Sequence, residues 1–389
     1  MTPKQRLLAA IRHQPVDRIP TTFRCHKTLA QDLLRYFSVP EKPPDAEASS
    51  RTADDLSEHF RDLLRDIGAD FWSSGSKVDR FATFVPRYSG PPPEPPYIDD
   101  GALFHALGIK SRQAEMGYRE MAYPHIGIDP PLADLTSAAD LENGFLTSRL
   151  DLFDFSRMHN RYREEGLDEL ADSQENIVCI GTLSVPFMTC SYLRGMERFL
   201  EDLAWEGPLV KRLVGEVGEF CLEFQRRELE ATRGKAVYYG TWDDVAGQDG
   251  MLFSPELFRK LFLPIYRRLI DAAKRHGLVF GWHCCGSVHE VLPSMIEAGI
   301  DVFDVVQTSA RDMDLETIHR RYGGNVCLHG GMDVQKLLVE QPPEAVRLEV
   351  RRAKDLWGTG GGIILAPSHE ALPDTPIENL LALYEEVAG

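Results

Sequence analysis

Short apolar runs alternate with longer helical patterns along most of the chain, and this alternation limits the possible folds more than any other feature. Strands that are each followed by a helix pair in parallel, because the connection between parallel strands has to cross over the sheet. Eight such units predict an α/β fold with a (β/α)₈ barrel of the TIM type. The eight candidate strands are residues 18–25, 68–74, 176–183, 236–244, 278–283, 300–306, 325–331 and 361–367.

The interval between the second and third candidate strands is long and contains a proline-rich stretch at residues 86–101. We interpret residues 75–175, with boundaries good to a few residues, as an insertion at the barrel mouth rather than an independent domain. A chain of 389 residues is long enough for one large α/β domain that carries such an insertion. We therefore expect a single barrel domain over residues 1–389.

The composition argues against several classes of partner. The net charge is −17 and no basic patch with interleaved aromatic residues is present, so nucleic acid is not expected to bind. The sequence has no apolar run long enough to span a membrane, and its N-terminus reads as an amphipathic helix without a signal peptide. The seven scattered cysteines are typical of reduced thiols. We expect a soluble, cytoplasmic protein.

The stretch FGWHCCGSV, residues 280–288, follows an apolar run and precedes a glycine. Side chains alternate along a strand, so His283 and Cys285 point the same way and Cys284 points the other way. An imidazole nitrogen and a thiolate on one side are competent zinc ligands. The alternative is a buried histidine beside two inert thiols. A third ligand has to come from elsewhere: His369 is the best candidate, with Asp244 and His329 as competitors.

Other polar residues also gather at strand ends, where a barrel places its active residues. We expect catalytic roles for Asp243 and Asp244, at the end of the fourth candidate strand, and for His329 in the seventh. The alternative for the two aspartates is a carboxylate pair satisfied by backbone N–H groups at a helix entry. The expected substrate-binding residues are Arg24, Gln248 and Gln307.

Several segments, taken in this order, resemble the uroporphyrinogen decarboxylase superfamily, and specifically its zinc-dependent, corrinoid-linked methyltransferase branch. They are residues 1–20, 243–277, 282–310, 328–335 and 361–387. The resemblance implies a (β/α)₈ barrel with zinc held by His283, Cys285 and a residue of a C-terminal turn. In that turn His369 stands where the branch has a cysteine. The paired arginines of true uroporphyrinogen decarboxylases are missing after the first strand, where only Arg24 and Lys27 offer positive charge.

This resemblance implies a zinc-dependent methyltransferase that moves a methyl group between a small methylated substrate, such as a methoxy compound, and a corrinoid protein. The lower-ligand pattern DxHxxG is absent, so we expect the cobalamin to be carried by a separate protein. Two neutral histidines and one thiolate leave a site of formal charge of about +1, which favours demethylation of a donor over methylation of a thiol.

Two other classes of function stay open at this point. The same barrel could be a decarboxylase or lyase acting on a small carboxylic acid or a porphyrinogen. It could also be a binding protein without catalysis, although the ring of polar residues at the strand ends argues against that.

Overall fold

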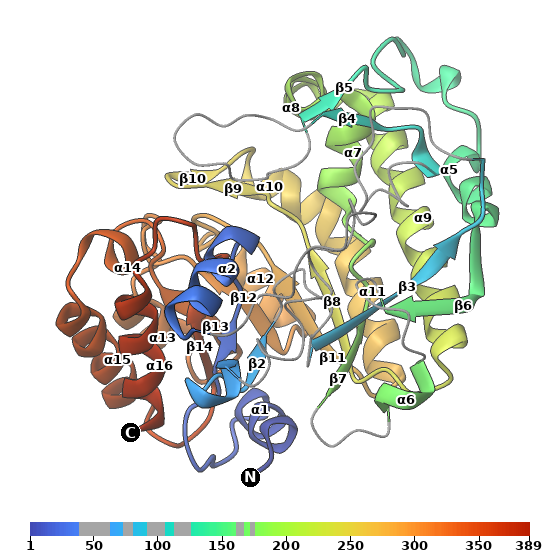
Figure 1. Ribbon diagram of the computed structural model, residues 1–389. Coiled ribbons are helices and arrows are strands. Elements are labelled where there is room, and N and C mark those ends of the chain that lie inside the picture. Colours follow the sequence, from blue (N-terminus) through green and yellow to red (C-terminus); the bar gives the residue numbers. More distant parts are fainter. Residues whose placement is uncertain (39–62, 73–80, 92–105, 113–125, 161–166, 172–175) are drawn as a thin grey trace. The chain divides into compact units, whose positions relative to one another are not determined.

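The computed structural model in Figure 1 describes residues 1–38, 63–72, 81–91, 106–112, 126–160, 167–171 and 176–389. The chain divides into two compact units, which are described separately. Unit 1 contains Met1–Thr83, Asn160–Val178 and Asp301–Gly389, and unit 2 contains Phe84–His159 and Cys179–Ile300. Each of the eight strands predicted from the sequence overlaps an observed strand.

Unit 1 is built from parallel strands with helices packed against them (Figure 1). Strand β13 lies between β12 and β14, while β1 pairs with β2, and a bridge from Thr21 to Leu365 joins the β1 segment to β14. The strands are β1 (Thr22–Phe23), β2 (Phe71–Trp72), β12 (Val302–Val306), β13 (Cys327–Met332) and β14 (Ile363–Pro367). The helices are α1 (Pro3–Ile11), α2 (Lys27–Tyr36), α13 (Leu315–Tyr322), α14 (Leu337–Glu340), α15 (Pro343–Trp357) and α16 (Ile377–Ala388).

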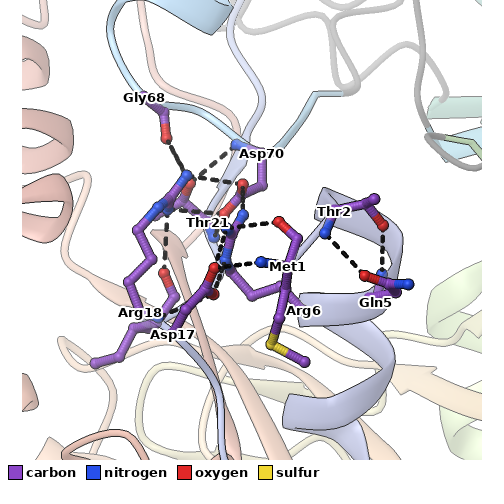
Figure 2. A network of polar contacts seen from close by, with 10 residues as sticks. Met1, Thr2, Gln5, Arg6, Asp17, Arg18, Thr21, Gly68 and Asp70 are labelled. Carbon is purple, nitrogen blue, oxygen red and sulfur yellow. Dashed lines mark hydrogen bonds and ion pairs between the residues drawn. The ribbon is translucent and has the colours of Figure 1, made fainter.

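A partly buried network of charges, centred on Asp70, connects α1 to the segments that enter β1 and β2 (Figure 2). Asp70 is 2% exposed and accepts hydrogen bonds from Arg6, from both terminal nitrogens of Arg18 and from the Thr21 backbone N–H. Arg6 also binds both carboxylate oxygens of Asp17, at 2.6 and 2.8 Å. The paired partners offset part of the cost of burying Asp70, although burial still raises the pKa of this carboxyl group. The network connects α1 to the segments that carry Arg18 and Asp70.

Unit 2 also has a parallel sheet, in which β8 lies between β7 and β11. Five residues of β8 and β11 pair in register, ending with Trp242 beside His283. The strands are β7 (Ile177–Ile180), of which unit 2 contains the last two residues, β8 (Tyr238–Trp242) and β11 (Val279–His283). Between β8 and β11 the chain forms the short antiparallel pair β9 (Ala246–Gly247) and β10 (Gly250–Met251). The helices are α7 (Pro186–Arg194), α8 (Met196–Trp205), α9 (Pro208–Thr232), α10 (Pro255–Leu257), η3 (Phe258–Phe262), α11 (Leu263–Arg275) and α12 (Leu292–Ala298).

The region predicted as an insertion carries strands of its own that the sequence did not indicate. Its described elements are β3 (Phe81–Tyr88), β4 (Lys110–Arg112), β5 (Ile126–Ile128), η1 (Ala138–Asp140), α5 (Phe145–Ser148), η2 (Arg149–Leu152), β6 (Phe153–Asn160) and α6 (Leu167–Ala171). Strands β4 and β5 form an antiparallel pair. Parts of the interval lie outside the described residues, and its placement at a barrel mouth stays a prediction. Among the described residues, every helix is too short or too polar to cross a membrane.

Candidate metal centre

The end of β11 places an imidazole and a thiol side by side. Cys285 Sγ lies 3.5 Å from His283 Nε2, and both residues are half-buried. Cys284, between them, is fully buried, where its sulfur accepts a hydrogen bond from the Val245 N–H and its thiol donates to the Cys285 carbonyl. Burial raises the pKa of the Cys284 thiol well above its usual range, and the Asp244 charge raises it further. The structure therefore has the alternation that the sequence predicted.

A carboxylate from the neighbouring strand joins this pair. Asp244 follows β8 by two residues, and its Oδ1 accepts a hydrogen bond of 2.9 Å from the Cys285 backbone N–H. One ligand atom each from Asp244, His283 and Cys285 lies within 4.8 Å of the others. A tetrahedral zinc ion requires ligand atoms about 3.3–3.8 Å apart, because each bond is about 2.0–2.3 Å long. An oxygen, nitrogen and sulfur donor set at this spacing fits zinc after small side-chain movements.

Asp243 has a different environment from its neighbour. Its side chain is fully buried and accepts hydrogen bonds from the backbone N–H groups of Phe187 and Met188, at 2.8 and 2.7 Å, and from the Tyr266 hydroxyl at 2.5 Å. Burial raises the pKa of Asp243 to about 7, although these three donors act in the opposite direction. Since Phe187 and Met188 belong to the first turn of α7, Asp243 caps this helix. These contacts are those of the alternative, a carboxylate satisfied by backbone N–H groups, and the catalytic role of Asp243 stays a prediction.

A glycine fixes the chain immediately after Cys285. Gly286 has φ +84°, and a Cβ atom added there would lie 2.5 Å from the Gly247 carbonyl oxygen. That oxygen accepts a hydrogen bond of 2.8 Å from the Ser287 N–H, so the backbone after β11 is held against β9. Only glycine combines this backbone angle with so close an approach.

Tyr192 is a candidate functional residue that the sequence analysis missed. It lies on α7, and burial raises its pKa, with further contributions from the charges of Asp244 and then Asp243. Its phenol is therefore a neutral hydrogen-bond donor near the carboxylates. The available signal was a hydroxyl-bearing aromatic residue in the helix that follows the third predicted strand, but nothing in the local pattern related it to residue 244.

His329 lies in unit 1, in the middle of β13. Its Nδ1 is 2.9 Å from Asp304 Oδ1 and its Nε2 is 2.6 Å from Thr22 Oγ1. Both ring nitrogens are thus engaged, which leaves neither of them for a metal in this arrangement.

Of the remaining predicted residues, Gln248 belongs to unit 2, whereas Arg24, Gln307 and His369 belong to unit 1. Gln248 is exposed at the turn between β9 and β10 of unit 2. In unit 1, Arg24 is exposed just after β1, and Gln307 follows β12 with its side-chain amide 3.4 Å from Ser309 Oγ. His369 is half-buried two residues after β14. Substrate binding by Arg24, Gln248 and Gln307 and zinc ligation by His369 stay predictions.

Comparisons with known proteins agree with this fold. Residues 147–389 match the family model described as uroporphyrinogen decarboxylase (URO-D). The chain is 23% identical to a methylcobamide:CoM methyltransferase of Methanosarcina acetivorans, over 99% of this chain and 97% of that protein. It is 25% identical to a methylated-thiol–coenzyme M methyltransferase of Methanosarcina mazei, over 56% of this chain and 54% of that protein.

A solved structure of a methyltransferase from Methanosarcina mazei superposes with a TM-score of 0.62 and 19% identity, over 100% of this chain and 98% of that one. This likeness and the family match confirm the predicted α/β fold of the TIM-barrel type. The predicted resemblance to the uroporphyrinogen decarboxylase superfamily, on its corrinoid-linked methyltransferase side, is confirmed as well.

Proposed function

We propose a methyl-transfer function for this chain, which belongs to the uroporphyrinogen decarboxylase (URO-D) family. The enzyme would move a methyl group between a small methylated compound, such as a methoxy compound, and a corrinoid carried by a separate protein. The observation that carries the proposal is the cluster of Asp244, His283 and Cys285 at the ends of β8 and β11. The near full-length similarity to a protein named as a methylcobamide:CoM methyltransferase supports it.

The donor set fits a zinc ion held by His283, Cys285 and Asp244, with His369 as the further ligand predicted from the sequence. Zinc bound there would supply Lewis acidity toward the heteroatom that carries the methyl group. The hydrogen bond from the Cys285 N–H orients the Asp244 carboxylate toward the pair. The neutral Cys284 thiol, turned away into the core, would keep Val245 and the Cys285 carbonyl in place.

Asp244 changes the electrostatic argument about the direction of transfer. One neutral histidine, one thiolate and one carboxylate bring the formal charge of the site to about zero, in place of the value of about +1 expected for two histidines and one thiolate. A less electropositive site favours loss of a methyl group from a bound donor less strongly. The preference for demethylation that the sequence predicted is therefore weakened, and both directions have to be assayed.

The proposal is tested by loading the purified protein with zinc and following the absorbance of the corrinoid. Cob(I)alamin is mixed with a panel of methoxy, methylthio and methylamine compounds, and methylcobalamin is mixed with small thiols in a parallel assay. We expect turnover in at least one direction that is lost in Cys285→Ser and retained in Cys284→Ser. If zinc does not bind and neither direction proceeds, the methyltransferase proposal is wrong.

Decarboxylation is the second candidate, because the family model carries that description. It would act on a porphyrinogen or a small carboxylic acid. The porphyrinogen is polyanionic and would need cations near the end of β1. Of the residues there, Arg24 is exposed, and the paired arginines expected for a porphyrinogen are missing from the sequence. Release of CO₂ from uroporphyrinogen, independent of added zinc, would support this candidate over methyl transfer.

A further inference from the structure

Three side chains from three strands of unit 1 form a hydrogen-bonded series. Thr22 on β1 lies 2.6 Å from His329 Nε2, and Asp304 on β12 lies 2.9 Å from His329 Nδ1. The side chains of His329 and Asp304 are 22% and 27% exposed, so the series is not sealed in the core. The order of a hydroxyl, an imidazole and a carboxylate is the one in which an imidazole takes a proton from the hydroxyl while the carboxylate orients it.

The sheet builds this series through register. Asp304 and His329 are directly paired between β12 and β13, and the pairing shifts immediately afterwards at a bulge between Asp304 and Val306. Gly330 follows His329 with φ +109°, and a Cβ atom there would lie 2.5 Å from Val305. A bulge of this kind re-aims the neighbouring side chains.

Thr22 reaches His329 from the far side of β14. The β1 segment bridges to Leu365 of β14, and β14 pairs with β13 so that Ile364 lies beside His329. Side chains from alternate strands meet in one layer of a barrel, which explains how β1 and β13 share a contact.

The partner of each ring nitrogen bears on which nitrogen carries the proton. An ionised Asp304 can only accept, so Nδ1 of the neutral imidazole is the protonated nitrogen and Nε2 has the free electron pair. Nε2 then accepts the Thr22 hydroxyl proton. We propose that Thr22, His329 and Asp304 form a proton relay that exchanges a proton with the oxygen or sulfur of a bound alcohol or thiol.

This inference rests on the proposed methyl transfer for its biological use. When a methyl group leaves a heteroatom, that atom keeps the electron pair of the broken bond and has to gain a proton. Thr22 would give its proton to such an atom of an alcohol or thiol bound within unit 1, and it would receive a proton from Nε2 of the protonated imidazole. In the opposite direction, the thiol proton would pass to Thr22 while the Thr22 proton passes to Nε2. Asp304 stays ionised and stabilises the imidazolium.

The first test measures the imidazole directly and needs no turnover. Nitrogen-15 NMR of the histidine-labelled full chain reports which ring nitrogen is protonated, with the His329 signals assigned by their loss in His329→Gln. We expect the Nδ1–H form in the wild type and a shift toward the Nε2–H form in Asp304→Asn. The Nε2–H form in the wild type would overturn the relay.

The second test measures methyl transfer in the zinc-loaded enzyme with cobalamin and the best substrate of the panel. General acid–base catalysis typically contributes about 10²–10⁴-fold, so we expect losses of at least about 10²-fold in Thr22→Val and His329→Gln. Thr22→Ser keeps a hydroxyl and should recover most of the rate, and the wild-type rate should fall in D₂O more than that of Thr22→Val. His276→Gln, on an exposed residue at the end of α11, is the matched control.

The two proposals fail in distinguishable ways. If the wild type transfers methyl groups and Thr22→Val matches it in rate and in sensitivity to D₂O, the relay is wrong and the methyl-transfer function stands. If no methyl transfer occurs but His329 is in the Nδ1–H form in the wild type and not in Asp304→Asn, the proposed function fails and the arrangement of the relay is supported.

Discussion

His283 and Cys285 direct their side chains to the same side of the end of β11, with Nε2 and Sγ 3.5 Å apart. This is possible because one residue separates them. That residue, Cys284, is buried and lies on the opposite side of the segment. The backbone N–H of Cys285 in turn holds Asp244 from the neighbouring strand. A pair set by local geometry thus becomes a cluster of three through strand pairing.

The two adjacent cysteines should differ in their effect on metal binding. Cys285→Ser removes a thiolate ligand, and we expect zinc affinity to fall by more than about 100-fold, beyond the effect of losing an outer hydrogen bond. Cys284→Ser, at a buried neutral thiol, should keep one zinc per chain. Metal analysis after dialysis measures both. Retention of zinc by Cys285→Ser together with its loss from Cys284→Ser would contradict the ligand assignment.

The zinc occupancy of the wild type should also fall as the pH is lowered, because imidazole and thiol bind zinc only when deprotonated.

Gly286 should be needed for the metal site more than for the fold. Gly286→Ala puts a Cβ atom 2.5 Å from the Gly247 carbonyl oxygen, so the turn has to move and Cys285 with it. We expect weaker zinc binding in a folded protein, measured by competition with a chromogenic chelator. Gly234→Ala is the matched control, because Gly234 has φ +76° with nothing within 4 Å of an added Cβ. Equal zinc affinities in the two variants would show that the close approach has no role.

Asp243 should make stability fall as the pH rises between about 4 and 7. Burial raises its pKa from 3.8 to about 7 in the folded protein, so the folded state binds more protons than the unfolded state in this window. Unfolding free energy then decreases with increasing pH. The side chain in Asp243→Asn cannot titrate. The unfolding free energy of the wild type, measured with urea relative to that of Asp243→Asn, should therefore decrease as the pH rises from about 4 to 7. A difference that is constant from pH 4 to 8 would contradict the raised pKa.

Asp70 should be among the most sensitive positions for stability. Asp70→Ala leaves Arg6, which is 9% exposed, and Arg18 without their shared carboxylate. Loss of one partner from a buried ion pair typically costs about 3–5 kcal/mol. Urea unfolding followed by circular dichroism measures the change. The control is Glu230→Ala, which removes an exposed ion pair with Arg226 and should leave the unfolding midpoint nearly unchanged. Similar midpoints for the two variants would show that the network contributes little.

Much of the fold was predictable because apolar patterning acts over short distances. The run GGIILAP predicted a buried strand, and β14 has all five residues buried. The strands β3 and β6 were missed, since they lie in an interval whose proline-rich and polar segments suggested loops. Asp243 and Asp244 are adjacent in sequence and share one local pattern, so only the packing of α7 and Tyr266 against Asp243 separates their roles.

The sequence by itself determined the order of the βα units and the shared direction of His283 and Cys285, because both follow from periodicities of the local backbone. It also indicated the family, because several segments resemble that family when they are taken in their order along the chain. Only the tertiary structure decided that Asp244 joins His283 and Cys285, and that Thr22 contacts His329 across 307 positions of the chain. The physical reason is strand register: which side chains meet across a sheet depends on how whole strands align, and no local pattern contains that alignment.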